Sequence, residues 1–300
     1  MSHSYQRIPY LVMFDDASAY RDTYGGTGEQ VALECYLLQP DRPSDTVLLF
    51  MHPIGGGAYL PINNALARAG HHVIYANSRY RGADYALVME KVAQDLGAAV
   101  RDARDRLGYK NVVLAGWSGG GALSVFYQQQ ARHATVTATP AGEPPDLTAA
   151  DLPAADALLL LAAHVSRHRT LTEWMDPSIL DENDPGARDP HLDLYDPANP
   201  NQPPYTADFI REYRAAQEAR NRRITAWVKD QLADLRAAGR PLTERAFVVH
   251  ATMADPRWLD PAVDPNDRRP RWCYLGDPEV VNMSPVGLAR FCTLRGWLSQ

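Results

Sequence analysis

The sequence is poor in cysteine, and its few cysteines lack the spacings of a disulfide framework. Three occur among 300 residues, at Cys35, Cys273 and Cys292, and no two of them form a C-x-x-C pair. An odd, widely spaced set of this kind excludes a small disulfide-stapled scaffold. We therefore expect buried or incidental thiols in a protein of a reducing compartment.

The sequence also has no long apolar segment and no excess of basic charge. Its longest run of aliphatic and alanine residues, 157–163, is far too short to cross a bilayer, and the first residues lack the basic and apolar regions of a signal peptide. The formal net charge of −6 argues against nucleic acids and anionic membranes as main partners. We expect a cytoplasmic protein that binds a small molecule, and a homo-oligomer remains open.

The overall amino-acid composition is that of an ordinary globular enzyme. Hydrophobic residues make up 45% and charged residues 22% of a chain long enough for one large domain, or for a core domain with an insertion. In the first half, strand-like and helix-like segments alternate, with strands at 31–38, 46–51, 72–76, 111–115 and 157–163 (the last of them buried) and helices at 59–69, 87–107 and 119–130. This alternation predicts an α/β fold with a mostly parallel sheet covered on both faces.

The second half has a different character. Residues 167–206 are rich in Asp, Pro and Asn and show little periodicity, whereas residues 207–238 predict a long amphipathic helix. Arg220 and three further basic residues lie off its apolar face, and a solvated helix surface is the simplest interpretation of them. We expect one more strand at 246–250 and a helix at 286–298.

The segment GWSGG, residues 116–120, fits the pattern G-x-S-x-G. An apolar strand, NVVLA, comes directly before it, and a helix-forming stretch comes directly after it. In this context the serine sits on a tight strand-to-helix turn, the nucleophile elbow, where glycines avoid clashes. The N-terminus of the helix favours the negative charge that develops in acyl transfer. The pattern therefore predicts Ser118 as a nucleophile rather than as part of a packing turn.

A second glycine-rich segment, MHPIGGG at residues 51–57, follows the strand TVLLF. A phosphate-binding loop is disfavoured here because no lysine–serine pair follows. No acidic residue stands where a dinucleotide site requires one either. We interpret His52 in this loop as structural rather than as a catalytic base.

These segments together resemble the α/β-hydrolase superfamily. Residues 45–165 resemble its first half, with HPIGGG after the third strand, GWSGG after the fifth and ALLLLAAH as the sixth. The stretches FVVHATMADPRWLDPAVDPNDR and GLARFCTLRGWLSQ resemble a poorly characterised bacterial group of such hydrolases. The resemblance implies a core at 1–165 and a largely helical cap at 166–300, inserted after the sixth strand. A cap shapes the substrate pocket and excludes water.

The resemblance also implies a mechanism that uses no cofactor and no metal ion. Ser118 would attack a carboxylic ester or thioester and form an acyl-enzyme. The backbone amide of Gly119 and that of Ile54 or Gly55 would form the oxyanion hole. Two alternatives remain, namely acyl transfer to an alcohol on the same site and a non-catalytic binding protein with a hydrolase fold.

In such hydrolases the acid and the histidine follow the serine, after the seventh and eighth strands. No histidine follows His250 in this sequence, and the last residues do not contain two further aliphatic strands. Two more strand–helix units need roughly 60 residues. We therefore expect the acid and the base beyond Gln300, in a longer chain. If Gln300 is the true C-terminus, a binding protein becomes the better hypothesis.

Within the sequence the best remaining base is His250, with Asp176 or Asp255 to orient it. His164 and His168 have a spacing that can bind a metal ion on a helix. They follow a strand, however, and no glutamate accompanies the first of them as a zinc protease motif requires. Packing at the end of the sheet, or surface exposure, is the simpler interpretation of both histidines.

Overall fold

The computed structural model describes residues 3–16, 26–27, 30–82, 84–202, 205–252 and 289–300. The chain divides into two compact units. We call residues 1–167 with 298–300 the core unit, and residues 168–297 the second unit. Among the described residues, no helix combines the length and the apolar character needed to cross a membrane.

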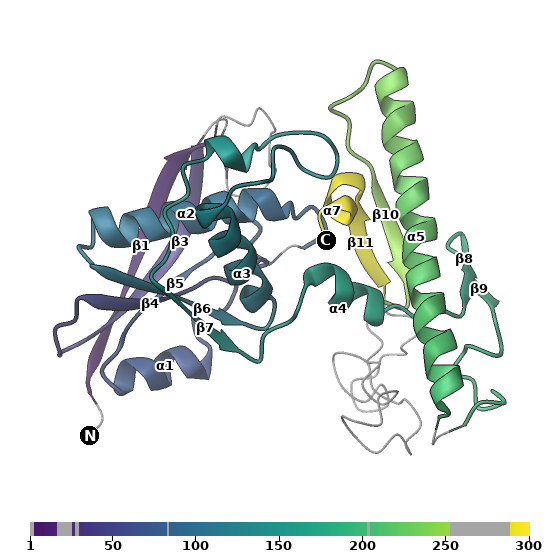
Figure 1. Ribbon diagram of the computed structural model, residues 1–300, viewed down its shortest axis with the longest axis horizontal. Helices are drawn as coiled ribbons and strands as arrows, with labels where there is room; N and C mark the ends of the chain where they lie inside the picture. Colours follow the sequence, from purple (N-terminus) through teal and green to yellow (C-terminus); the bar gives the residue numbers. More distant parts are fainter. Residues whose placement is uncertain (1–2, 17–25, 28–29, 83, 203–204, 253–288) are drawn as a thin grey trace. The chain divides into compact units, whose positions relative to one another are not determined.

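The core unit is built on a seven-stranded sheet (Figure 1). Its strands are β1 (Tyr5–Asp15), β2 (Gly26–Thr27), β3 (Gln30–Pro40), β4 (Thr46–Phe50), β5 (His72–Ala76), β6 (Asn111–Trp117) and β7 (Ala157–Leu161). They lie in the order β1-β3-β5-β4-β6-β7, with β2 paired to β3. β3 is antiparallel to β1 and β5, whereas β5, β4, β6 and β7 are parallel. The prediction of a mostly parallel sheet is confirmed.

Helices cover both faces of this sheet. They are α1 (Pro61–Arg68), α2 (Met89–Asp105) and α3 (Gly119–Arg132). α2 and α3 pack against each other and against β6, and α1 covers the opposite face beside β3 and β5 (Figure 1). Val92, Leu96 and Val100 of α2 are spaced by four residues and are almost wholly buried. The helical period therefore directs one apolar face of α2 into the main hydrophobic core.

A buried ion pair lies beside this apolar core. The Arg79 guanidinium donates from Nε to Oδ1 of Asp95 at 2.9 Å, and from Nη1 to Oδ2 of Asp16 at 2.5 Å. The backbone N–H of Arg79 donates to the other Asp95 oxygen at 2.9 Å. Because all three side chains are buried, the pairing ties the segment after β5 to α2 and to the end of β1.

The two edges of the sheet are where the sequence predictions fell short. The predicted strands and helices of the core unit all occur, but β1 was not predicted. β1 is an edge strand, and Leu11 and Met13 on it are 58% and 53% exposed, so it lacks a strict apolar alternation. At the other edge lies β7, predicted as buried; Leu158 and Leu160 are 38% and 49% exposed. An aliphatic run does not by itself distinguish a central strand from an edge strand.

The second unit combines one long helix with two antiparallel strand pairs, β8–β9 and β10–β11 (Figure 1). Its elements are α4 (Arg167–Glu173), β8 (Ile179–Asp181), β9 (Asp184–Arg188), α5 (Ala207–Ala237), β10 (Ala246–His250), β11 (Ala289–Thr293) and α7 (Leu294–Leu298). α5 begins after Thr206, whose side-chain oxygen accepts the N–H of Phe209 at 3.2 Å as an N-cap. The predicted helix at 207–238 and the predicted strand at 246–250 are confirmed.

The predicted helix at 286–298 is wrong over half of its described length. Residues 289–293 form β11, which pairs antiparallel with β10, and the helix that follows spans only Leu294–Leu298. Along β11 the exposed Phe291 lies between buried neighbours, a period of two that the sequence analysis did not recognise. Residues 286–288 lie outside the described part of the chain.

The prediction that Arg220 is a solvated residue of the long helix is also wrong. Arg220 is 1% exposed, and its guanidinium bonds both carboxylate oxygens of Glu182 at 2.7 and 2.6 Å. The same group donates to the backbone carbonyls of Asp176 at 2.7 Å and His250 at 2.8 Å. Arg220 thus joins α5 to the β8–β9 hairpin and to β10. Arg222, on the solvent side of the helix, is exposed as expected.

Candidate active site

Ser118 lies on the turn between β6 and α3. Its backbone has φ 55° and ψ −124°, a conformation that costs a non-glycine residue about 1–3 kcal/mol and persists only where the surroundings hold it. The Ser118 N–H donates to the carbonyl of Leu161 at 3.2 Å, and the Ser118 carbonyl accepts the N–H of Gly121 at 3.0 Å. The half-buried side chain follows the carboxyl end of β6. The predicted elbow therefore has the strand–turn–helix context and the strained backbone of that motif.

The glycines around Ser118 lie where neighbouring segments of the chain pack too closely for a side chain to fit. A Cβ on Gly116 would lie 2.5 Å from the carbonyl oxygen of Gly120, and a Cβ on Gly120 would lie 2.5 Å from that of Met51. A Cβ on Gly121 would collide with Ala163, just beyond β7. The start of α3 thus packs tightly against its own strand, against the loop after β4 and against the end of β7.

The loop after β4 carries the predicted oxyanion donors. The Gly55 N–H donates to the His52 carbonyl at 2.8 Å, and the Gly56 N–H donates to Oδ1 of Asn77 at 2.8 Å. The Ile54 N–H lies 3.4 Å from Nδ1 of His52, at the long end of hydrogen-bond distances. Because the loop's own turn uses the Gly55 amide, Ile54 is the better of the two loop candidates. Its assignment, and that of Gly119 at the start of α3, remain predictions.

His164 is the residue that the sequence analysis did not connect with Ser118. After β7 the chain bends at Ala162, which has φ 44°, and the His164 N–H donates to the Ser118 carbonyl at 3.0 Å. This places Nε2 of His164 3.4 Å from Oγ of Ser118. Burial lowers the pKa of His164 from its ordinary value. The parallel pairing of β6 and β7 was the available signal, since residues that follow neighbouring parallel strands meet at one edge of the sheet.

His52 lies next to the start of α3. Its Nε2 is 3.0 Å from the point where a Gly119 Cβ would stand, and its ring is 6.2 Å from that of Trp117. Burial, and then the positive charge of Arg167 and the ring of His164, lower the pKa of His52 to about 4. His52 is therefore neutral at neutral pH. The structural role expected for it fits its packing beside the elbow.

Two of the residues expected as in-chain alternatives for base and acid belong to the second unit. His250 ends β10 in the second unit, and Asp176 is fully buried in the same unit. The Asp176 carboxylate accepts Nη2 of Arg188 at 2.6 Å and the hydroxyl of Ser178 at 2.7 Å, so it is already engaged. Asp255 lies outside the described residues. In the described part of the chain, no group of three or more His, Cys, Asp or Glu side chains could hold a metal ion.

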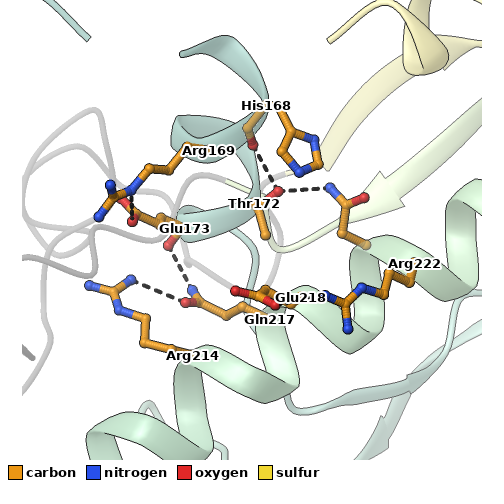
Figure 2. Close-up of a pocket in the computed structure, with 9 residues that line it drawn as sticks. His168, Arg169, Thr172, Glu173, Arg214, Gln217, Glu218 and Arg222 are labelled. Carbon is orange, nitrogen blue, oxygen red and sulfur yellow. Dashed lines mark hydrogen bonds and ion pairs between the residues drawn. The ribbon is translucent and has the colours of Figure 1, made fainter. Parts of the chain in front are cut away.

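The second unit has a cavity of about 600 Å³ between α4 and α5 (Figure 2). It is lined by His168, Arg169, Thr172, Glu173, Arg214, Gln217, Glu218, Asn221 and Arg222. Arg169 pairs with Glu173 at 2.8 Å and Arg222 pairs with Glu218 at 3.0 Å, while the buried Gln217 donates to two backbone carbonyls. Because these lining groups bond one another, we assign no ligand to this cavity.

Comparison with known proteins gives structural matches only. No family model and no curated protein matches the sequence. A brefeldin A esterase, described as a bacterial homologue of human hormone sensitive lipase, matches at 20% identity over 42% of this chain and 36% of that one, with a TM-score of 0.30. A bacterial heroin esterase matches at 18% identity over 58% and 47%, with a TM-score of 0.32. Candida antarctica lipase A in its closed state matches at 12% identity over 62% and 46%, with a TM-score of 0.35.

This chain thus spans less than half the length of each of these three proteins. The fold follows from the chain's own topology. If the short β2 is left out and the other strands are numbered along the chain from β1, their order across the sheet is first, second, fourth, third, fifth and sixth. The serine elbow follows the fifth of them, β6. The core unit has the fold of the first six strands of an α/β-hydrolase.

Proposed function

We propose that Ser118 is the nucleophile of a serine hydrolase that cleaves a carboxylic ester or thioester through an acyl-enzyme. The observation that carries this proposal is the backbone of Ser118, with φ 55° between the interior parallel strand β6 and the first residue of α3. A strained serine flanked by glycines exposes its Oγ above the sheet at the positive end of a helix. No structural requirement of the turn itself explains a serine there, since glycine adopts this backbone without strain.

The steps follow from the groups around Ser118. Oγ attacks the carbonyl carbon, its proton passes to a histidine, and the carbonyl electron pair moves onto oxygen. The amides of Gly119 and Ile54 would stabilise that oxyanion. Collapse of the tetrahedral intermediate expels an alcohol or a thiol, which takes up the proton. Water then attacks the acyl-enzyme by the same sequence and releases the acid.

A fluorophosphonate probe tests the nucleophile directly, because it forms a stable bond with an activated serine Oγ. We expect one label per chain, located on Ser118 by peptide mass spectrometry, and complete loss of the label in Ser118→Ala. Ser124→Ala is the matched control, since Ser124 lies on the same helix with its hydroxyl bonded to the Gly120 carbonyl at 2.8 Å. An unlabelled Ser118 in the folded protein would contradict the proposal and favour a binding role.

Hydrolysis and acyl transfer share this site and differ only in what attacks the acyl-enzyme. A p-nitrophenyl acyl ester series, assayed with and without an added alcohol, separates them by product analysis. We expect free acid as the main product. A predominant new ester would assign the site to acyl transfer instead.

A further inference from the structure

Two backbone hydrogen bonds connect the turn after β7 to the nucleophile elbow. The Ser118 N–H donates to the Leu161 carbonyl at 3.2 Å, and the His164 N–H donates to the Ser118 carbonyl at 3.0 Å. Both backbone polar groups of the serine are thus bonded to this turn. Between Leu161 and His164, Ala162 adopts φ 44°, in the left-handed region that a side chain rarely enters. The result of this bend is a histidine whose backbone position is fixed relative to the nucleophile.

The side chains of the two residues meet at the reacting atom. Nε2 of His164 lies 3.4 Å from Oγ of Ser118, a distance that is long for a hydrogen bond but usual for a nucleophile and its base before substrate binds. A serine hydroxyl can donate only to the unprotonated nitrogen of an imidazole. Because burial lowers the pKa of His164, the ring is neutral at neutral pH, and its Nδ1–H tautomer accepts the Ser118 proton at Nε2.

The charged and titratable neighbours favour the same form. His52 comes from the loop after β4 and interacts electrostatically with His164. Arg167 stands at the start of α4 and lies 3.4 Å from the Asp84 carboxylate. The Arg167 guanidinium disfavours a second positive charge on His52, and burial disfavours one on His164. Both histidines are therefore neutral when Ser118 reacts.

We infer that His164 is the general base that removes the proton from Ser118. This assignment rests on the proposed function and differs from the expectation of a base beyond Gln300 or at His250. As the bond from Oγ to the carbonyl carbon forms, the Oγ–H bond breaks and its proton moves to Nε2 of His164. The protonated ring then returns that proton to the departing alcohol or thiol. In deacylation His164 takes a proton from water in the same way.

The test measures the rate at which the fluorophosphonate probe labels Ser118 in His164→Gln and His164→Ala. Loss of a general base slows such a step about 10²- to 10⁴-fold, so we expect at least a 100-fold fall in both variants. His133→Ala is the control, because that exposed histidine follows α3 and takes no part in the site. Its labelling rate should match that of the unaltered protein.

Two further readouts separate a base from a merely structural residue. In the unaltered protein the labelling rate should fall as the pH drops through a midpoint below 6.5, the ordinary histidine value, and this limb should vanish in His164→Gln. Added imidazole should restore part of the labelling in His164→Ala, because a small base can occupy the vacated space. Circular dichroism spectra and melting temperatures verify that the variants are folded.

The outcomes distinguish the two proposals. If Ser118 is never labelled in the unaltered protein, the proposed function fails, and the role of His164 fails with it. If Ser118 is labelled, but His164→Gln reacts at the unaltered rate with the same pH limb, Ser118 is a nucleophile whose base is another group. That second result would overturn only the assignment of His164.

Discussion

The two units each bury an arginine, but they use it differently. In the core unit, Arg79 lies next to a large apolar cluster that the strands and α2 already form. In the second unit, Arg220 is the largest fully buried side chain, and its bonds join segments separated by 30 to 44 residues. The core unit is built around one large apolar cluster, whereas in the second unit a buried arginine network stands beside a smaller apolar cluster of Leu192, Leu194, Tyr205, Phe209 and Tyr213.

A second arginine continues this pattern in the second unit. Arg188, at the end of β9, bonds Asp176 at 2.6 Å and Asp193 at 2.5 Å. Asp176 therefore takes part in both arrangements, through its carboxylate to Arg188 and through its carbonyl to Arg220. Hydrophobic periodicity carries no information about such a network, so it predicted α5 and β10 of the second unit but not the burial of Arg220.

The strongest test of this comparison removes Arg220. We expect Arg220→Met to lower the free energy of unfolding by about 3–5 kcal/mol, because the carbonyls of Asp176 and His250 and the partly buried Glu182 carboxylate all lose the same charged donor. Urea denaturation monitored by circular dichroism measures the loss. Arg222→Met, at a residue on the exposed side of the same helix, should change the free energy of unfolding by less than about 0.5 kcal/mol. Equal effects of the two substitutions would mean that the second unit does not depend on this network.

A smaller effect is expected where the core unit depends on close backbone packing. In Gly120→Ala the new Cβ would lie 2.5 Å from the Met51 carbonyl oxygen, which cannot rotate away. We expect a loss of about 1–3 kcal/mol from overpacking, together with slower labelling of Ser118 as the elbow shifts. Gly97→Ala is the matched control, because its Cβ would come close only to the movable end of the Leu152 side chain, at 2.8 Å, and lie at ordinary contact distance from Tyr127. If the probe labels Ser118 in Gly120→Ala as fast as in the unaltered protein, the packing of the loop against the elbow does not set the geometry of the site.

The smallest effect is expected at the outer edge of the sheet. Leu160→Lys on β7 should change the free energy of unfolding by less than about 0.5 kcal/mol, because the leucine is 49% exposed. Leu114→Lys on the adjacent β6 should unfold the protein, since that side chain is fully buried. Urea denaturation compares the two. A large loss from Leu160→Lys would show that β7 is covered in solution, and sedimentation would reveal whether a second copy covers it.

The sheet from β3 onward and the elbow could be predicted from the sequence, because both produce patterns among residues that are close in the sequence. Val92, Leu96 and Val100 show the helical period, and the glycines around Ser118 mark the tight turn. β1 was missed because apolar residues also stand on its exposed face, and β11 because its arginine, Arg290, is buried while its Phe291 is exposed. The buried state of Arg220 depends on Glu182 and His250, partners that no local window contains.

The candidate site was only half predictable for a similar reason. Ser118, Gly119 and the loop at 51–57 are marked by glycines, whereas His164 carries no motif of its own. Its closeness to Ser118 follows from the order of β6 and β7 in the sheet and from the bend at Ala162. Only a prediction of strand order, followed to the residues just beyond each strand, would have brought the two together.

The positive φ of Ser118 has a consequence for how such a chain changes over evolutionary time. At this one position the residue best for folding is glycine and the residue best for chemistry is serine, so the two requirements oppose each other. A lineage released from selection for catalysis has a single substitution available that removes the nucleophile and relieves backbone strain at once. A serine retained at this position is therefore a sign of selection for chemistry rather than for stability.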